Sequence, residues 1–238
     1  MVVLNLKEED LKYLKLVGMG AEGAVYQLRD KIIKIYNEPE EHNLKKIKYL
    51  CKIQPKIKNT EFIIGKVNID GEFKGVIQKY FKNYYTIDIL DYSMNLNQIL
   101  CFYIKLLQCI KELTDNNLYP SDLYYKNILI KFINRDVKII DLDGNGIIIK
   151  KEANKKLLQN TLNTYLSTMI ESLYFNDLNE EHYITYKDII KKYPFDDYYK
   201  NIILNGELSY KFIIEFIRYI AINKTKLLDD KQLKAKKY

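Results

Sequence analysis

The chain has 238 residues, of which 47% are hydrophobic and 29% are charged. This length allows one large or two small domains, each with its own core. No run of about 18 apolar residues indicates a membrane-spanning helix, and the first ten residues lack the pattern of a signal peptide. Composition therefore argues against a membrane partner, and we expect a globular, cytoplasmic protein.

The formal net charge of +7 raises the question of a nucleic-acid partner. The chain is also rich in Ile, Asn and Tyr, a mixture that an AT-rich coding sequence produces together with Lys, so a solvated lysine surface is the favoured interpretation. Arginine, the usual bidentate ligand of phosphate, occurs only at Arg29, Arg135 and Arg218. An RNA-binding face is left as a weakly supported alternative.

The three cysteines, Cys51, Cys101 and Cys109, are odd in number and show no C-x-x-C spacing. This pattern predicts buried thiols in place of a disulfide framework or a zinc site. Histidine occurs only at His42 and His182, which removes most metal and triad chemistry based on imidazole.

The first third of the chain alternates as β-strands do. Strands are predicted at residues 11–17, 24–28, 31–36, 62–67 and 72–80, the last two joined by the turn Asp70-Gly71. Between them, Pro39 occupies a first helical position, and Leu44, Ile47 and Cys51 recur at helical spacing. We therefore expect about five antiparallel strands with one helix.

The remainder is predicted to be mainly helical. Apolar residues fall at steps of three and four over residues 95–115 and again from about 156 to 173, and a largely apolar stretch covers 210–222. From Asn223 on, the lysine-rich end is expected to fray or to form a short helix. The predicted fold class is α+β, with domains at 1–80 and 81–238 and a boundary near residues 81–86.

A glycine-rich segment, G-M-G-A-E-G-A-V-Y, joins the first two predicted strands and contains Gly18, Gly20 and Gly23. Residues without a Cβ let backbone N–H groups approach phosphate oxygens closely, and Val25 would then cover a flat base. The segment leads into a strand and not a helix, so it differs from the dinucleotide-binding fingerprint. A plain hairpin with glycine in its turn is the alternative.

Lys34 lies between Ile33 and Ile35 in an apolar strand. A strand that lines a cleft would direct this lysine at the α- and β-phosphates of a nucleotide. Such a lysine needs a carboxylate partner, and Glu40 is our choice because it shares a helical face with Leu44. The alternatives are a solvated lysine on an edge strand and an acidic residue that only offsets the helix dipole.

Three polar residues follow in a fixed order. Asp122 and Asn127 lie five residues apart in D-L-Y-Y-K-N, and Asp141 ends an apolar run in I-I-D-L-D-G. Asp122 suits the task of orienting or deprotonating a hydroxyl, while Asn127 and Asp141 offer oxygen ligands to Mg²⁺. Surface turns capped by Asp and Asn are the alternative interpretation.

These fragments together resemble the protein kinase-like superfamily over roughly residues 11 to 175. The glycine segment is similar to G-x-G-x-x-G-x-V, Lys34 to the lysine of V-A-I-K, Asp122 and Asn127 to H-R-D-L-x-x-x-N, and Asp141 to the first residue of D-F-G. The resemblance implies a two-lobed kinase fold with ATP and Mg²⁺ as cofactors. It also implies that the adenine forms hydrogen bonds with the backbone near Gln78 to Tyr80.

The chain departs from the regulated protein kinases. Pro120 and Ser121 stand where His and Arg precede the aspartate, and no A-P-E follows Asp141. Activation by phosphorylation is therefore not expected. A short activation segment is similar to that of aminoglycoside or choline phosphotransferases and of small atypical kinases, and G-A-E-G is similar to a segment of the compact kinase that works with the tRNA threonylcarbamoyl machinery.

We therefore expect an enzyme, an ATP- and Mg²⁺-dependent phosphotransferase that acts on a hydroxyl of a protein or small molecule. Lys34 and Asp122 would be the catalytic residues. One alternative is a pseudokinase that binds nucleotide or serves as a scaffold without turnover, a second is a small-molecule kinase of the aminoglycoside or choline type, and a third transfers AMP to the acceptor.

Overall fold

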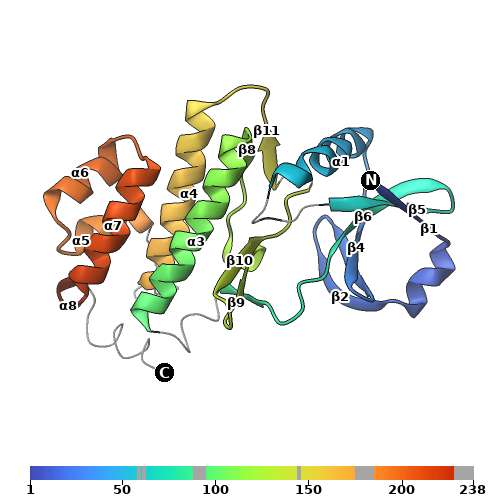
Figure 1. Ribbon diagram of the computed structural model, residues 1–238, viewed down its shortest axis with the longest axis horizontal. Coiled ribbons are helices and arrows are strands. Elements are labelled where there is room, and N and C mark those ends of the chain that lie inside the picture. Colours follow the sequence, from blue (N-terminus) through green and yellow to red (C-terminus); the bar gives the residue numbers. More distant parts are fainter. Residues whose placement is uncertain (58–59, 61–62, 88–94, 144–145, 175–184, 228–238) are drawn as a thin grey trace. The chain divides into compact units, whose positions relative to one another are not determined.

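The computed structural model describes residues 1–57, 60, 63–87, 95–143, 146–174 and 185–227 (Figure 1). The chain divides into two compact units, Met1–Asn83 with Ile140–Gly146, and Tyr84–Ile139 with Ile147–Tyr238. The division predicted from sequence assigns Asp141 to the second part, whereas the structure packs its segment with the first unit. The fold class is α+β, as expected.

The first unit is built on a six-stranded mixed sheet with the order β1-β5-β6-β4-β3-β2. Its strands are β1 (Val2–Leu6), β2 (Lys15–Gly20), β3 (Gly23–Leu28), β4 (Lys31–Tyr36), β5 (Ile63–Ile69) and β6 (Glu72–Lys79). All neighbours are antiparallel except β1 and β5, which are parallel. The expected sheet of about five antiparallel strands is therefore corrected, because β1 adds a sixth strand at the edge.

A short 3-10 helix, η1 (Glu8–Tyr13), replaces the first half of the strand predicted at residues 11–17. Its first turn holds Glu8, Glu9 and Asp10, and acidic side chains stabilise the start of a helix. The turn between β5 and β6 matches the prediction, since Asp70 and Gly71 have φ angles of 49° and 89°. Positive φ at both central residues gives the backbone twist that a two-residue hairpin turn requires.

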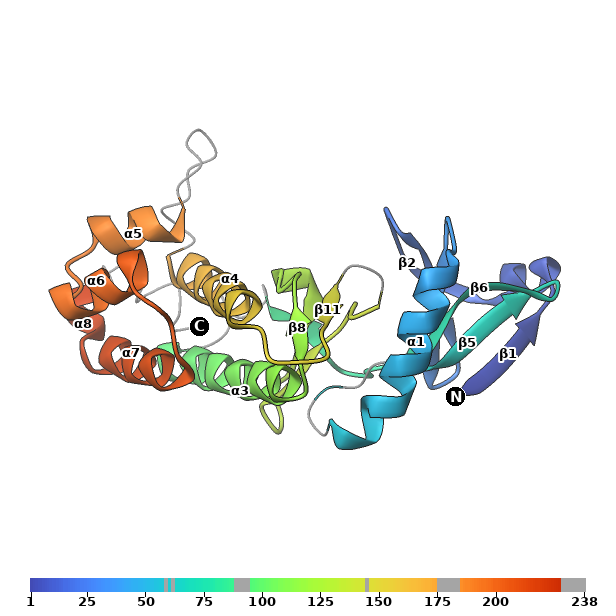
Figure 2. The same ribbon diagram turned by 90° about the horizontal axis from the view of Figure 1, so that it is seen from above.

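Helix α1 (Glu41–Ile53) lies against β5 on one face of this sheet (Figure 2). Of the residues predicted at helical spacing, Ile47 is buried, whereas Leu44 and Cys51 are half-buried; Leu50 is buried as well. The start of the helix was predicted at Pro39 and is two residues later. Glu40 is the N-cap, with an extended backbone (φ −110°, ψ 155°), so it does not share a helical face with Leu44. The 3-10 turn η2 (Gln54–Lys56) follows.

Gly23 is required by the packing of β3 on β4. A Cβ at this position would overlap the carbonyl oxygen of Ile35, whereas a Cβ at Gly18 would meet nothing within 4 Å. We expect Gly23→Ala to lower the free energy of unfolding by about 1–3 kcal/mol, as overpacking does elsewhere. Urea denaturation measures this, with Gly18→Ala as the matched control. Equal stability of the two variants would contradict this account of Gly23.

The second unit combines short strands with a helical bundle. Its strands are β7 (Tyr85–Thr86), β8 (Leu118–Pro120), β9 (Ile128–Lys131), β10 (Asp136–Ile139) and β11 (Ile147–Ile149). Its helices are α3 (Leu96–Asp115), η4 (Tyr125–Asn127), α4 (Lys155–Leu173), α5 (Tyr186–Lys192), α6 (Asp197–Asn205), α7 (Tyr210–Ile222) and α8 (Lys224–Leu227). The three long helices fall where the sequence predicts them, and α8 matches the short helix offered as the alternative to a frayed end.

Helix α3 begins at a capping box. The Asn95 side chain accepts a hydrogen bond from Gln98 N, and the Gln98 side chain accepts one from Asn95 N, both at 3.1 Å. Figure 1 shows α3 and α4 side by side. Between them the buried Tyr165 hydroxyl donates to the carbonyl of Tyr103 at 2.8 Å, so this polar group is satisfied inside the core.

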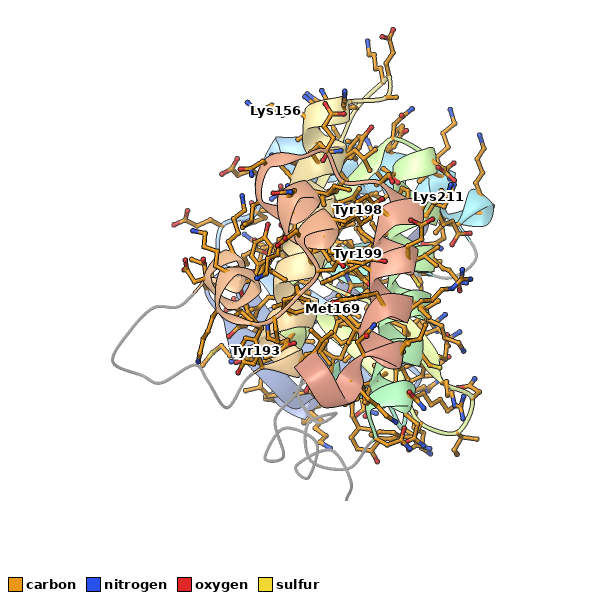
Figure 3. The ribbon with its side chains drawn as sticks, turned by 90° about the vertical axis from the view of Figure 1, so that its left-hand side faces the viewer. Lys156, Met169, Tyr193, Tyr198, Tyr199 and Lys211 are labelled. Carbon is orange, nitrogen blue, oxygen red and sulfur yellow. The ribbon has the colours of Figure 1, made fainter. Side chains whose placement is uncertain are left out.

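Aromatic side chains join α6 to α7. Tyr199 packs against Phe212, Phe216 and Tyr219, with ring centroids 4.4–5.9 Å apart. In Figure 3, Tyr199 lies between these two helices. These contacts cover part of the buried face of α7, which consists of Phe212, Ile213, Phe216, Ile217 and Ile220.

All three cysteines are free thiols, as expected, but only Cys109 is buried, whereas Cys51 and Cys101 are half-buried. The expectation of three buried thiols is therefore corrected. His182 lies outside the described residues. None of the helices in the described part of the chain is long and apolar enough to cross a bilayer.

Candidate functional site

Lys34 is the centre of a cluster of charged residues inside the first unit. It lies on β4, and the residue is only 7% exposed. Its Nζ is 2.5 Å from Asp141 Oδ1, 2.7 Å from Glu22 Oε2 and 3.3 Å from Asp143 Oδ2. A buried ammonium is costly without such partners, so these three carboxylates account for the burial of the charge.

The register of the sheet decides which residues share a face with Lys34. Directly paired residues point to the same side, and Lys34 pairs with Val25 on β3 and Val76 on β6. Tyr36 is two residues further along the strand and points the same way. The opposite face carries Ile33 in the apolar core. Lys34 is therefore on the face that does not carry this core. Because β4 lies between β3 and β6 and Lys34 is buried, the alternative of a solvated lysine on an edge strand is wrong.

Glu22 reaches the lysine from the turn between β2 and β3. Gly20 pairs with Gly23 across this turn. Asn37, directly after β4, forms two hydrogen bonds with this turn. Its backbone N–H donates to the Glu22 carbonyl at 3.0 Å, and its side-chain amide donates to the Ala21 carbonyl at 2.9 Å. The glycine segment is thereby held over the end of β4, with its one carboxylate directed at Lys34.

Asp141 has a φ of 59°, in the left-handed region. This conformation is uncommon for residues other than glycine, although Asp and Asn tolerate it best. Two residues later, the carbonyl of Asp143 accepts a hydrogen bond from Gly146 N at 3.0 Å. A Cβ at Gly146 would overlap the Asp141 carbonyl oxygen, so glycine is needed where the chain passes close to this residue.

Asp143 is the most deeply buried carboxylate of the cluster, with 1% of the residue exposed. It accepts a hydrogen bond from the Tyr36 hydroxyl at 2.6 Å and one from Gln78 Nε2 at 3.2 Å, and it pairs with Lys34. These contacts satisfy both of its oxygens. Asp143 thus ties the segment after β10 to strands β4 and β6.

The pKa values follow from this arrangement. Burial acts to lower the pKa of Lys34, but the charges of Asp143 and Asp141 and the hydrogen bonds to Asp141 and Glu22 outweigh it, so the pKa is raised above its usual value. Burial raises the pKa of Asp141, although Lys34 opposes this change. The pKa of Tyr36 is raised by burial and by Asp143. The lysine is therefore held as a cation and the tyrosine as a neutral donor.

Because the pKa of Lys34 is raised by folding, the stability of the folded protein depends on pH in the alkaline range. Its contribution to stability is complete below the unfolded-state pKa of about 10.4 and is lost as pH rises toward the higher folded-state value. We expect the free energy of unfolding to fall above about pH 10, and to fall less in Lys34→Arg, which stays charged in this range. Urea denaturation at a series of pH values measures the difference. Parallel curves for the two proteins would contradict the coupling.

Oxygen atoms from Glu22, Asp141 and Asp143 all lie within 4.8 Å of one another. Carboxylates are the ligand type that Mg²⁺ prefers, so the donor set around Asp141 fits a hard cation. Lys46 on α1 is also near: burial lowers its pKa, and the charges of Asp143 and Glu22 oppose this. Two lysines and three carboxylates therefore belong to one electrostatic cluster.

The other residues proposed to contact nucleotide are placed as follows. A Cβ at Gly18 or Gly20 would meet nothing within 4 Å, so open space surrounds both. Gln78 is on β6, where its side chain contacts Asp143, and the Tyr80 backbone N–H donates to the Asp30 carbonyl at 3.0 Å. The adenine contacts near these two residues stay predictions.

Asp122 and Asn127 come together in the second unit. Asn127 Nδ2 donates to Asp122 Oδ2 at 2.9 Å and to the Asp122 carbonyl at 3.3 Å, which fixes the loop between them. Asp122 is exposed and Asn127 half-buried. Strand β9 starts directly after Asn127, and its first residue, Ile128, pairs with Ile139 at the end of β10. The chain therefore enters and leaves this hairpin at Asn127 and residue 140.

The partners of Lys34 differ from the one predicted. Glu40 was chosen on the basis of a shared helical face, but it precedes the helix, and the ion pairs of Lys34 are with Glu22, Asp141 and Asp143. The sequence did contain a signal: a buried lysine needs nearby carboxylates, and one acidic residue stands in the glycine segment while two stand in D-L-D.

A scan of the chain against protein-family models found no match, and a search of curated proteins found no similar sequence.

Proposed function

We propose that the protein is an ATP- and Mg²⁺-dependent phosphotransferase with a two-lobed, protein kinase-like fold. The observation that carries this proposal is the 2.5 Å contact between Lys34 on β4 and Asp141, 107 residues later, in the unit that also holds the glycine hairpin. A lysine with no such role would not need to be buried among three carboxylates, one of which comes from the glycine segment.

Lys34 would bind the α- and β-phosphates, aided by the backbone of the glycine segment, in which Gly18 and Gly20 leave room for an anion. Asp143 and Tyr36 would hold the lysine in place. Asp141 would hold Mg²⁺, which when bound neutralises charge on the phosphate oxygens.

Asp122 would orient the acceptor hydroxyl and receive its proton. The acceptor oxygen forms a bond to the γ-phosphorus while the bond from that phosphorus to the β,γ-bridging oxygen breaks, so ADP leaves with the negative charge. The hydrogen bonds from Asn127 to Asp122 support this role by restraining the carboxylate. Such catalysis depends mostly on positioning and charge neutralisation.

A pseudokinase is the second candidate, and one observation favours it. Three carboxylates already balance the charge of Lys34, and its side chain is only 8% exposed. A nucleotide phosphate would have to compete with these carboxylates for the ammonium group. A pseudokinase that binds nucleotide slowly or without turnover would have the same three ion pairs at its lysine.

Intact mass after incubation with ATP and Mg²⁺, together with ADP release in the presence of candidate acceptors, tests the proposal. A phosphoryl transferase gives ADP and a mass gain of one phosphate on itself or on an acceptor. A mass gain of one AMP would instead show that the protein transfers the nucleotide and not the phosphoryl group. A thermal shift with ATP and Mg²⁺ but no ADP release across all acceptors would favour the pseudokinase.

A further inference from the structure

A cavity of about 410 Å³ lies in the second unit, beside the loop that carries Asp122. It is lined by Tyr119, Pro120, Ser121, Ile148, Leu157, Asn160, Thr161, Asn163 and Thr164. This volume is within the range of about 300–1,000 Å³ that small-molecule sites occupy. Ser121 lines the cavity and directly precedes Asp122 in the chain.

The walls are built from a two-stranded ribbon and one face of a helix. Strands β8 and β11 pair through Tyr119 and Ile148, and both strands are visible in Figure 2. Residues 157, 160, 161 and 164 are spaced three and four apart, so they share one face of α4. The Thr161 hydroxyl donates to the Pro120 carbonyl at 3.1 Å, which fastens this face to the residue before Ser121.

The lining is polar but carries no charge among the described residues. Three of its nine side chains are apolar or proline, Tyr119 adds an aromatic ring, and the other five have hydroxyl or amide groups. Hydroxyls and amides both donate and accept hydrogen bonds, as the hydroxyls of a sugar or nucleoside do. A cationic acceptor would need carboxylates here, and a phosphorylated one would need Lys or Arg.

Asn160 is the side chain best placed to contact a ligand. It is exposed, and its amide has no hydrogen-bond partner among the described residues. Asn163, in contrast, is held by bonds to the Gln159 carbonyl and from the Tyr186 hydroxyl, both at 2.8 Å. Asn160 is therefore a contact group, and Asn163 is part of the wall.

We propose that this cavity binds the acceptor of phosphoryl transfer, and that the acceptor is an uncharged, hydroxyl-rich small molecule of the sugar or nucleoside class. The proposal rests on the proposed function, because Asp122 is its link to catalysis. It disfavours the cationic acceptors that the resemblance to aminoglycoside and choline kinases suggests.

Ligand-observed NMR without nucleotide tests the cavity itself. The full chain is mixed at millimolar concentration with a neutral panel (glucose, trehalose, uridine), a charged panel (kanamycin, choline, glucose 6-phosphate) and neutral Ser/Thr peptides. We expect the neutral small molecules to bind. Asn160→Leu should lower their affinity about tenfold, as the loss of one or two hydrogen bonds does. Asn205→Leu, at an exposed asparagine at the end of α6, is the control.

Phosphoryl transfer from ATP to the same compounds separates the two proposals. Neutral binding that is sensitive to Asn160→Leu supports the cavity, even where no phosphate is transferred and the proposed function fails. Binding of charged compounds or peptides alone overturns the cavity proposal, as does absence of neutral binding or neutral binding that Asn160→Leu leaves unchanged.

Discussion

Lys34→Met is expected to reduce ATP turnover by about 10²-fold or more, the loss seen when one charge-stabilising donor is removed from an active site. The side chain keeps a similar length and apolar stem but loses the ammonium group that would contact the phosphates. It also leaves Asp143 buried without its cation, next to Asp141 and Glu22. Repulsion among these carboxylates adds a loss of stability.

Measurement of ADP release and of the free energy of unfolding in the same preparation separates these effects. Lys31→Met is the matched control: it lies on the same strand, points to the opposite face and pairs with Asp30 at 3.4 Å. We expect this control to keep the parent's turnover. Turnover in Lys34→Met equal to that of the parent, in a folded protein, would remove Lys34 from the catalytic machinery.

Asp141→Asn is expected to reduce turnover by a similar factor and to weaken the dependence on Mg²⁺, because an amide oxygen is a poorer ligand of a hard cation than a carboxylate. Asparagine tolerates the left-handed backbone found at this residue, so the substitution tests charge and not conformation. The buried lysine keeps Glu22 and Asp143 as partners.

Magnesium titration of the reaction rate measures the effect. Asp70→Asn serves as the control, since Asp70 has a φ of 49° in the exposed turn after β5 and takes the same substitution in the same backbone conformation. An unchanged rate and an unchanged magnesium midpoint in Asp141→Asn would contradict its assignment to the metal, whatever the behaviour of Lys34→Met.

The sequence predicted those helices and turns whose signal lies within a short stretch of chain. Helices α3, α4 and α7 were predicted from apolar residues at steps of three and four, and the β5–β6 hairpin from Asp70-Gly71, because these signals depend on neighbours within one or two turns of chain. The parallel pairing of β1 with β5 was missed, since Val2 and Gly65 are far apart in sequence. Such pairing has no local signature.

In the charged cluster too, local features were predicted correctly and the partner of Lys34 was not. A lysine between two isoleucines predicted its strand, and a carboxylate after an apolar run predicted a strand end at Asp141. The choice of Glu40 failed because it depended on where a helix begins, and one or two residues decide which side chains share a face.

What the sequence determined by itself was the type and order of the groups: a glycine-rich segment, a lysine in an apolar strand, and aspartates at loop and strand ends. The tertiary structure alone decided that Glu22 and Asp143 join Asp141 on Lys34. The physical reason is that periodicity assigns a side chain to a face, whereas the partner it meets there depends on strand register and on the path of distant segments, such as the one that carries Asp141, 107 residues from Lys34.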